Sequence, residues 1–179
     1  MNIRGGNTEH TDFDVDLDFR NDVGYQSLME QRYKEFFGVM NRVSIKRITE
    51  GDGVLIIIDD GEQYIKVLEK HDRYKNTGNA VLELWGDLNH KKGWLYAAQC
   101  DWLAYHYDAT GITHFIPMPA LRKAWNKYES EWLDTYRIVL RENKGLAAQI
   151  ILIPLNVLWE AMHDVMIHNH LSGDIAKWM

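Results

Sequence analysis

The feature that most constrains the fold is a hairpin pattern in the first half of the chain. Residues 54–58 form the continuous apolar run Val-Leu-Ile-Ile-Ile, which is typical of a strand buried on both faces. The segment Asp-Asp-Gly-Glu follows at 59–62, and Asp and Gly accept the backbone angles that a tight hairpin requires. A return strand is expected over 63–70. The chain is therefore expected to fold around a β-sheet.

Helical and extended periods alternate along the rest of the chain. Apolar residues recur at steps of three and four over 25–37, 121–134 and 155–168, which predicts three helices. The segment 97–107 fits a short amphipathic helix or a helix that runs into a strand, and 86–92 is expected to be a loop. Further strands are expected over 42–48, 79–85, 112–118, 136–141 and 149–153. This order predicts an α+β sandwich in which helices flank one central mixed β-sheet.

Charge is unevenly distributed along the 179 residues, whose formal net charge is −6. Residues 1–22 hold six acids and two bases, a net charge of −4, so the rest of the chain carries only −2. This balance argues against a protein that coats nucleic acid nonspecifically, but it allows a local basic groove. We expect an acidic, partly mobile N-terminal arm over 1–22 and a single domain over 23–179.

The compartment is predicted from what the sequence lacks. No run approaches the roughly 18 apolar residues of a membrane-spanning helix, and residues 1–10 lack the apolar centre of a signal peptide. Cys100 is the one cysteine of the chain, so no intramolecular disulfide can form. These features predict a cytoplasmic protein without a membrane partner.

Three residues near the predicted hairpin suggest phosphodiester chemistry. Asp52 precedes one strand, and Glu69 and Lys70 lie on its expected neighbour. Carboxylates hold Mg²⁺ through oxygen ligands, and a lysine orients water and offsets charge on the phosphate. This order alone also arises by chance in charged hairpins.

A longer string adds a family resemblance. Residues 69–83, which contain Thr-Gly-Asn at 77–79, are followed by Lys-Gly-Trp-Leu-Tyr at 92–96 and Asp-Trp-Leu-Ala-Tyr at 101–105. This pattern resembles small phage and prophage proteins of the PD-(D/E)XK nuclease superfamily, and the likeness extends over 14–158. The resemblance implies a restriction-endonuclease-like fold, DNA as the ligand and, in an active enzyme, Mg²⁺ as the cofactor. A viral protein would act in the host cytoplasm.

The catalytic motif of this family is degenerate here. The resemblance carries the catalytic lysine onto Lys70, the first aspartate onto Asp52 and the glutamate onto Leu68, which cannot bind a metal. Glu69 is adjacent, but strand alternation points it away from Lys70 unless a β-bulge turns it inward. The metal ligands would then be Asp52, Glu69 and Glu83. Whether the protein is an enzyme therefore stays open.

Nucleic-acid contacts are expected around the basic loop 70–75. Lysine and arginine there would bind phosphate without reading sequence. One tryptophan follows Lys-Lys-Gly and would either stack on a base or pack in the core. The expected contact residues are Arg73, Lys75, Thr77, Asn79 and Trp94.

Three functions follow as hypotheses. The first is a phage-type nuclease-fold protein that binds DNA, single- or double-stranded, with impaired or lost cleavage. The second is an active Mg²⁺-dependent endonuclease or exonuclease. The third is a non-catalytic accessory module that binds a replication, transcription or host-defence protein through the acidic arm.

Overall fold

The structure is a computed structural model that describes residues 22–38, 44–50, 53–59, 64–72, 78–88, 91–143 and 146–171. The chain divides into two compact units, Met1–Gly38 and Val39–Met179. The expected acidic arm therefore lies, apart from Asp22, outside the described residues.

Helix α2 (Val23–Phe37) is the described element of the first unit. Asp22 caps its first turn by accepting hydrogen bonds from the backbone N–H groups of Gly24 at 2.7 Å and Tyr25 at 3.1 Å. Gly38 ends the helix with a φ of 69°, a left-handed conformation that glycine adopts without steric penalty. The helix matches the expectation for 25–37 and begins two residues earlier.

The second unit contains the remaining helices and all the described strands. In chain order they are β1 (Ser44–Glu50), β2 (Gly53–Asp59), β3 (Tyr64–Asp72), β4 (Asn79–Asp87), β5 (Lys91–Lys92), α3 (Trp94–Ala97), β6 (Trp102–Tyr107), β7 (Ile112–Pro117), α4 (Met118–Thr135), β8 (Ile138–Asn143), β9 (Leu146–Pro154) and α5 (Leu155–Leu171).

The first sheet has five strands in the order β1-β2-β3-β6-β7. Strands β1, β2 and β3 form an antiparallel meander, β6 pairs in parallel with β3, and β7 returns antiparallel to β6. The sheet is therefore mixed. Its parallel step requires a long crossover, and the chain makes it through β4, β5 and α3.

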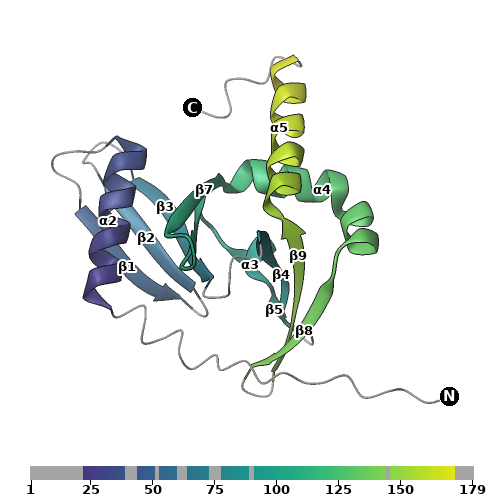
Figure 1. Cartoon of the computed structure of the whole chain (residues 1–179), viewed down its shortest axis with the longest axis horizontal. Helices are drawn as coiled ribbons and strands as arrows, with labels where there is room; N and C mark the ends of the chain where they lie inside the picture. Colours follow the sequence, from purple (N-terminus) through teal and green to yellow (C-terminus); the bar gives the residue numbers. More distant parts are fainter. Residues whose placement is uncertain are drawn as a thin grey trace. The chain divides into compact units, whose positions relative to one another are not determined.

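The second sheet has four antiparallel strands in the order β5-β4-β9-β8. Strands β8 and β9 form a hairpin that leads directly into α5 (Figure 1). One face of this sheet contributes Leu82 and Ile151 to a large hydrophobic core. The same core takes Leu68 and Leu103 from the first sheet, so the two sheets share one hydrophobic cluster.

Helices α4 and α5 lie beside each other and cover this core (Figure 1). Trp125 and Trp132 of α4 are fully or almost fully buried, as are Leu158 and Met162 of α5. Asp164 of α5 accepts a hydrogen bond from the Tyr128 hydroxyl at 2.7 Å. A polar contact thus fixes how the two helices meet outside the apolar seam.

The predicted α+β class and its mixed sheet are confirmed. The expectation of one sheet was wrong. The chain leaves the first sheet after Asp72, at the end of β3, and the next strand, β4, pairs with β9 in a second sheet. The segment 97–107 follows the second of its two alternatives, a helical turn in α3 that leads into β6. The expected loop at 86–92 contains the short strand β5, which a pattern of two residues cannot reveal.

No helix among the described residues is both long enough and apolar enough to span a bilayer.

Candidate nucleic-acid interface

Four of the predicted site residues fall outside the described residues. They are Asp52, Arg73, Lys75 and Thr77. The structure therefore places five of the predicted side chains, those of Glu69, Lys70, Asn79, Glu83 and Trp94.

Glu69 lies on the face of β3 opposite Lys70. The pairing of β3 with β2 and β6 is continuous through Glu69, so no bulge turns its side chain toward Lys70. Its carboxylate is buried and accepts hydrogen bonds from Nη1 of Arg47 on β1 at 3.1 and 3.3 Å. Glu69 therefore forms an internal ion pair, and buried Leu68 occupies the face it would need.

Lys70, Glu83 and Trp94 are brought together where β3, β4 and α3 meet. The Lys70 ammonium lies 5.8 Å from the Trp94 ring centroid, and a Glu83 carboxylate oxygen accepts the Trp94 backbone N–H at 3.2 Å. Trp94 itself is only 8 % exposed and belongs to the core. The core-packing interpretation of Trp94 is confirmed, and a base cannot stack on a ring so deeply buried.

Asn79 begins β4 and pairs with Pro154 of β9. Its backbone carbonyl accepts a hydrogen bond from the Tyr107 hydroxyl at 2.7 Å. This contact ties β4 to β6 and gives Asn79 a structural role.

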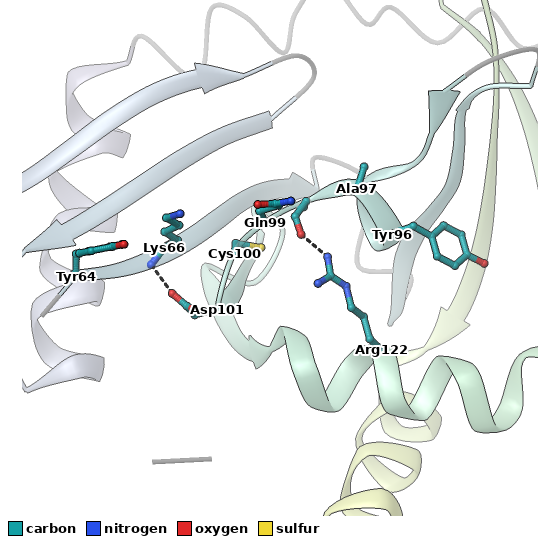
Figure 2. A pocket seen from close by; sticks show the side chains of 9 residues that line it. Tyr64, Lys66, Tyr96, Ala97, Gln99, Cys100, Asp101 and Arg122 are labelled. Atoms are coloured by element: carbon teal, nitrogen blue, oxygen red, sulfur yellow. Dashed lines mark hydrogen bonds between the residues drawn. The ribbon is translucent and has the colours of Figure 1, made fainter. Parts of the chain in front are cut away.

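A pocket of about 610 Å³ opens between β3, the loop after α3 and the start of α4. Its lining contains two cationic and two tyrosine side chains and one acid, Asp101. Figure 2 shows Tyr64 and Lys66 on β3 at one end, Tyr96 at the other, and Arg122 reaching in from α4.

Asp101 fixes the floor of this pocket to β3. Its side chain accepts the Lys66 backbone N–H at 2.8 Å (Figure 2). Its own backbone N–H donates to the Lys66 carbonyl at 2.8 Å. The Asp101 carbonyl also accepts the Met118 N–H at 2.9 Å, at the start of α4. The backbone around Lys66 is therefore held rigidly while its ammonium remains outside this network.

Arg122 shapes the opposite wall. Its Nε donates to the Leu95 carbonyl at 2.9 Å, and its Nη2 donates to the Ala98 carbonyl. Both acceptors are neutral, so the guanidinium keeps its full positive charge in the pocket. A fixed cation of this kind suits an anionic ligand, because little side-chain entropy is lost on binding.

Two aromatic side chains at this site are exposed. Tyr64 is 63 % exposed and Tyr96 is 38 % exposed. Tyr96 is also oriented, because its hydroxyl accepts the Trp125 indole N–H at 2.8 Å and donates to Glu129 at 3.2 Å. Exposed, oriented rings are the platforms on which single-stranded bases stack.

Cations accompany these rings. The Lys66 ammonium lies 5.6 Å from the Tyr64 ring centroid, and the Lys92 ammonium lies 5.5 Å from the Tyr96 ring centroid. Each exposed ring thus has a positive charge beside it, the combination by which single-strand binders hold a base and its phosphate. We call Tyr64, Lys66, Lys92, Tyr96 and Arg122 the basic–aromatic site.

Cys100 also lines the pocket, but its thiol is inert. Burial raises the pKa of Cys100 from 9.0 to about 11, and only the thiolate is strongly nucleophilic. The side chain belongs to the hydrophobic core.

The basic–aromatic site was not predicted from the sequence. Its members come from β3, β5, α3 and α4, which the fold brings together through the pairing of β3 with β6 and the packing of α3 against β4 and β5. The one local signal is the alternation of Tyr64 with Lys66, which places both side chains on one strand face.

Comparison with models of protein families found no matching family, and comparisons with curated proteins and with solved structures found no match.

Proposed function

We propose that this chain is a phage-type nuclease-fold protein that binds DNA, with a preference for single strands, and that has lost efficient cleavage. The nuclease ancestry rests on the resemblance of residues 69–105. The observation that carries the binding function is the basic–aromatic site, in which exposed Tyr64 and Tyr96 each stand beside a lysine.

The loss of cleavage is supported by the surroundings of Lys70. A nuclease of this type needs carboxylates on the same side as its lysine, to hold Mg²⁺ against the phosphate. Leu68 fills the equivalent position here, and Glu69 is paired with Arg47 on the other face. Glu83 is engaged with the backbone of Trp94. Positive charge at Lys70 still favours a phosphate without any metal step.

The binding geometry follows from the fixed parts of the pocket. Bases stack on Tyr64 and Tyr96, and the intervening phosphates lie near Lys66 and Arg122. Asp101 keeps its negative charge beside this path, but it is one acid against the two cations Lys66 and Arg122 in the pocket lining.

The test is fluorescence anisotropy of labelled oligodeoxynucleotides, single- and double-stranded, at low salt. Tyr64→Ala should weaken single-strand binding by about 1–3 kcal/mol, since one stacking platform is lost. Lys66→Gln should also weaken it, whereas Lys34→Gln, a matched loss of one exposed charge on α2, should not. Equal binding by all variants, or no binding by the wild type, would contradict the proposal.

Cleavage is tested on the same DNA with Mg²⁺ and Mn²⁺. The expected result is that the DNA stays intact with both ions. Metal-dependent nicking that disappears in Lys70→Ala would instead establish an active nuclease.

A further inference from the structure

A second cluster of chemically active side chains lies away from the basic–aromatic site. His71 on β3 faces His106 on the parallel strand β6 in direct register, and Asp108 follows the end of β6. His71 and Lys66 are an odd number of residues apart on a continuous strand, so they project from opposite faces of the sheet. The cluster is thus independent of the pocket.

The geometry points to a binding site for a divalent transition-metal ion, of the Zn²⁺ class, held by His71, His106 and Asp108. One ligand atom from each residue lies within 4.8 Å of the other two. His71 Nε2 contacts Asp108 Oδ1, and His106 Nε2 lies 3.7 Å from the same oxygen. Tetrahedral zinc with bonds of 2.0–2.1 Å separates its ligand atoms by about 3.3 Å. The His106–Asp108 separation is close to this value, whereas His71 and Asp108 are in direct contact and their side chains would move apart to admit the ion.

The two imidazoles are already aligned for a shared ion. Their rings are stacked, with centroids 5.5 Å apart and an interplanar angle of 14°. Both direct Nε2 at the same carboxylate. An ion at the point of convergence would receive two nitrogen ligands and one oxygen ligand without any change in the strands.

Neighbouring groups hold the ligands in place. His106 Nδ1 lies 2.9 Å from the hydroxyl of Thr113, its register partner on β7. The Asp108 backbone N–H donates to the Asp72 carbonyl at 3.0 Å. When His106 Nδ1 donates to Thr113, the lone pair on Nε2 faces Asp108, and a cation between them converts this repulsion into coordination.

Burial of the ligands sets the route by which the ion enters, and the ligand types set its chemical class. The side chains of His71 and His106 are 11 % and 4 % exposed, whereas that of Asp108 is 34 % exposed. The ion would therefore enter past Asp108. Two imidazoles and one carboxylate suit Zn²⁺ and its transition-metal neighbours, while Mg²⁺ prefers oxygen ligands alone. Three protein ligands leave a coordination position for water or another small ligand.

The experiment is calorimetric titration of the chelator-treated full chain with Zn²⁺, repeated with Co²⁺ to record its visible absorption. We expect one tight site per chain. Asp108→Asn and His71→Gln should each weaken it at least about tenfold, because each removes a ligand. Thr113→Val should weaken it by about 10–100-fold through loss of the contact that orients His106.

His163→Gln is the matched control, because it removes an exposed imidazole on α5 and should leave the tight site unchanged. Asp108→Asn decides the matter if His71→Gln fails to fold, since the Asp108 side chain is partly exposed. Zn²⁺ affinity in Asp108→Asn equal to that of the wild type, or no tight uptake by folded wild type, would overturn the site. Equal competition by Mg²⁺ would overturn the assignment to a transition metal.

Discussion

At the scale of single residues, Glu69 shows how a catalytic-looking carboxylate becomes structural. Its side chain is 3 % exposed, and that of its partner Arg47 is 16 % exposed. A buried ion of this kind depends on its partner, because removing one charge leaves the other desolvated and uncompensated. The pair therefore links β1 to β3 across β2 and is not available to a metal.

Glu69→Gln should lower the free energy of unfolding by about 1.5–3 kcal/mol, the usual range for loss of a charged hydrogen bond. Urea denaturation measures this change. The double variant Arg47→Met with Glu69→Leu should recover much of the loss, since an apolar pair leaves no buried charge. Unchanged stability in Glu69→Gln would mean that the ion pair contributes nothing.

Cys100 provides a residue-scale prediction about alkaline pH. Burial raises its pKa to about 11 in the folded chain, above the value of 9.0 for an exposed thiol. The folded state therefore retains the proton longer than the unfolded state, and stability is lost as the pH rises from about 9 to 11.

Cys100→Ala should reduce this alkaline loss, measured as the difference in unfolding free energy between pH 8.5 and pH 11. Burial also raises the pKa of Tyr107, so part of the loss will remain in the variant. Identical pH profiles for the variant and the wild type would contradict the assigned role of the thiol.

At the scale of elements, the position of α3 depends on one close approach. Gly93 donates its backbone N–H to the Leu84 carbonyl at 2.8 Å. A Cβ on Gly93 would lie 2.1 Å from the Glu83 carbonyl oxygen and 2.8 Å from the Leu84 carbonyl carbon. These neighbours are backbone atoms of β4, so they cannot move aside without disturbing the second sheet.

Gly93→Ala should destabilise the chain by about 1–3 kcal/mol through overpacking, and it should weaken DNA binding because α3 carries Tyr96. Thermal melting and anisotropy measure the two effects. The matched control is Gly111→Ala, where no atom lies within 4 Å and only a φ of +66° opposes the side chain. Gly111→Ala should leave DNA affinity unchanged, whereas unaltered affinity in Gly93→Ala would contradict the role of α3.

The elements that the sequence predicted well are those with a strong local period. The apolar run at 54–58 lies within β2, and the helical spacing at 121–134 lies within α4. The division into two sheets depends on the pairing of β4 with β9, far along the chain, which no local pattern specifies. Strand β5 pairs with its neighbour β4, but its two residues are too few to show a period. Lys70, Glu83 and Trp94 were predicted because they lie in short segments that resemble a motif. Arg122 was missed because it lies on α4 and reaches the pocket only in the folded chain.

At the scale of the whole molecule, function depends on where charge is placed and not on its total. The net charge of −6 includes −4 from residues 1–22, so the remainder of the chain can present the basic–aromatic site. The acidic segment stays a predicted contact for a basic protein partner. Deleting residues 12–22 tests that prediction separately, because it leaves every member of the site in place.

The measurement that bears most directly on the central claim is the salt dependence of single-stranded DNA binding. Each lysine–phosphate contact contributes about 0.7 to the slope of log affinity against log salt. The double variant Lys66→Gln with Lys92→Gln should therefore lower the slope by about 1.4 relative to the wild type. An unchanged slope, or wild-type protein that fails to bind at low salt, would contradict the proposal that the basic–aromatic site binds DNA.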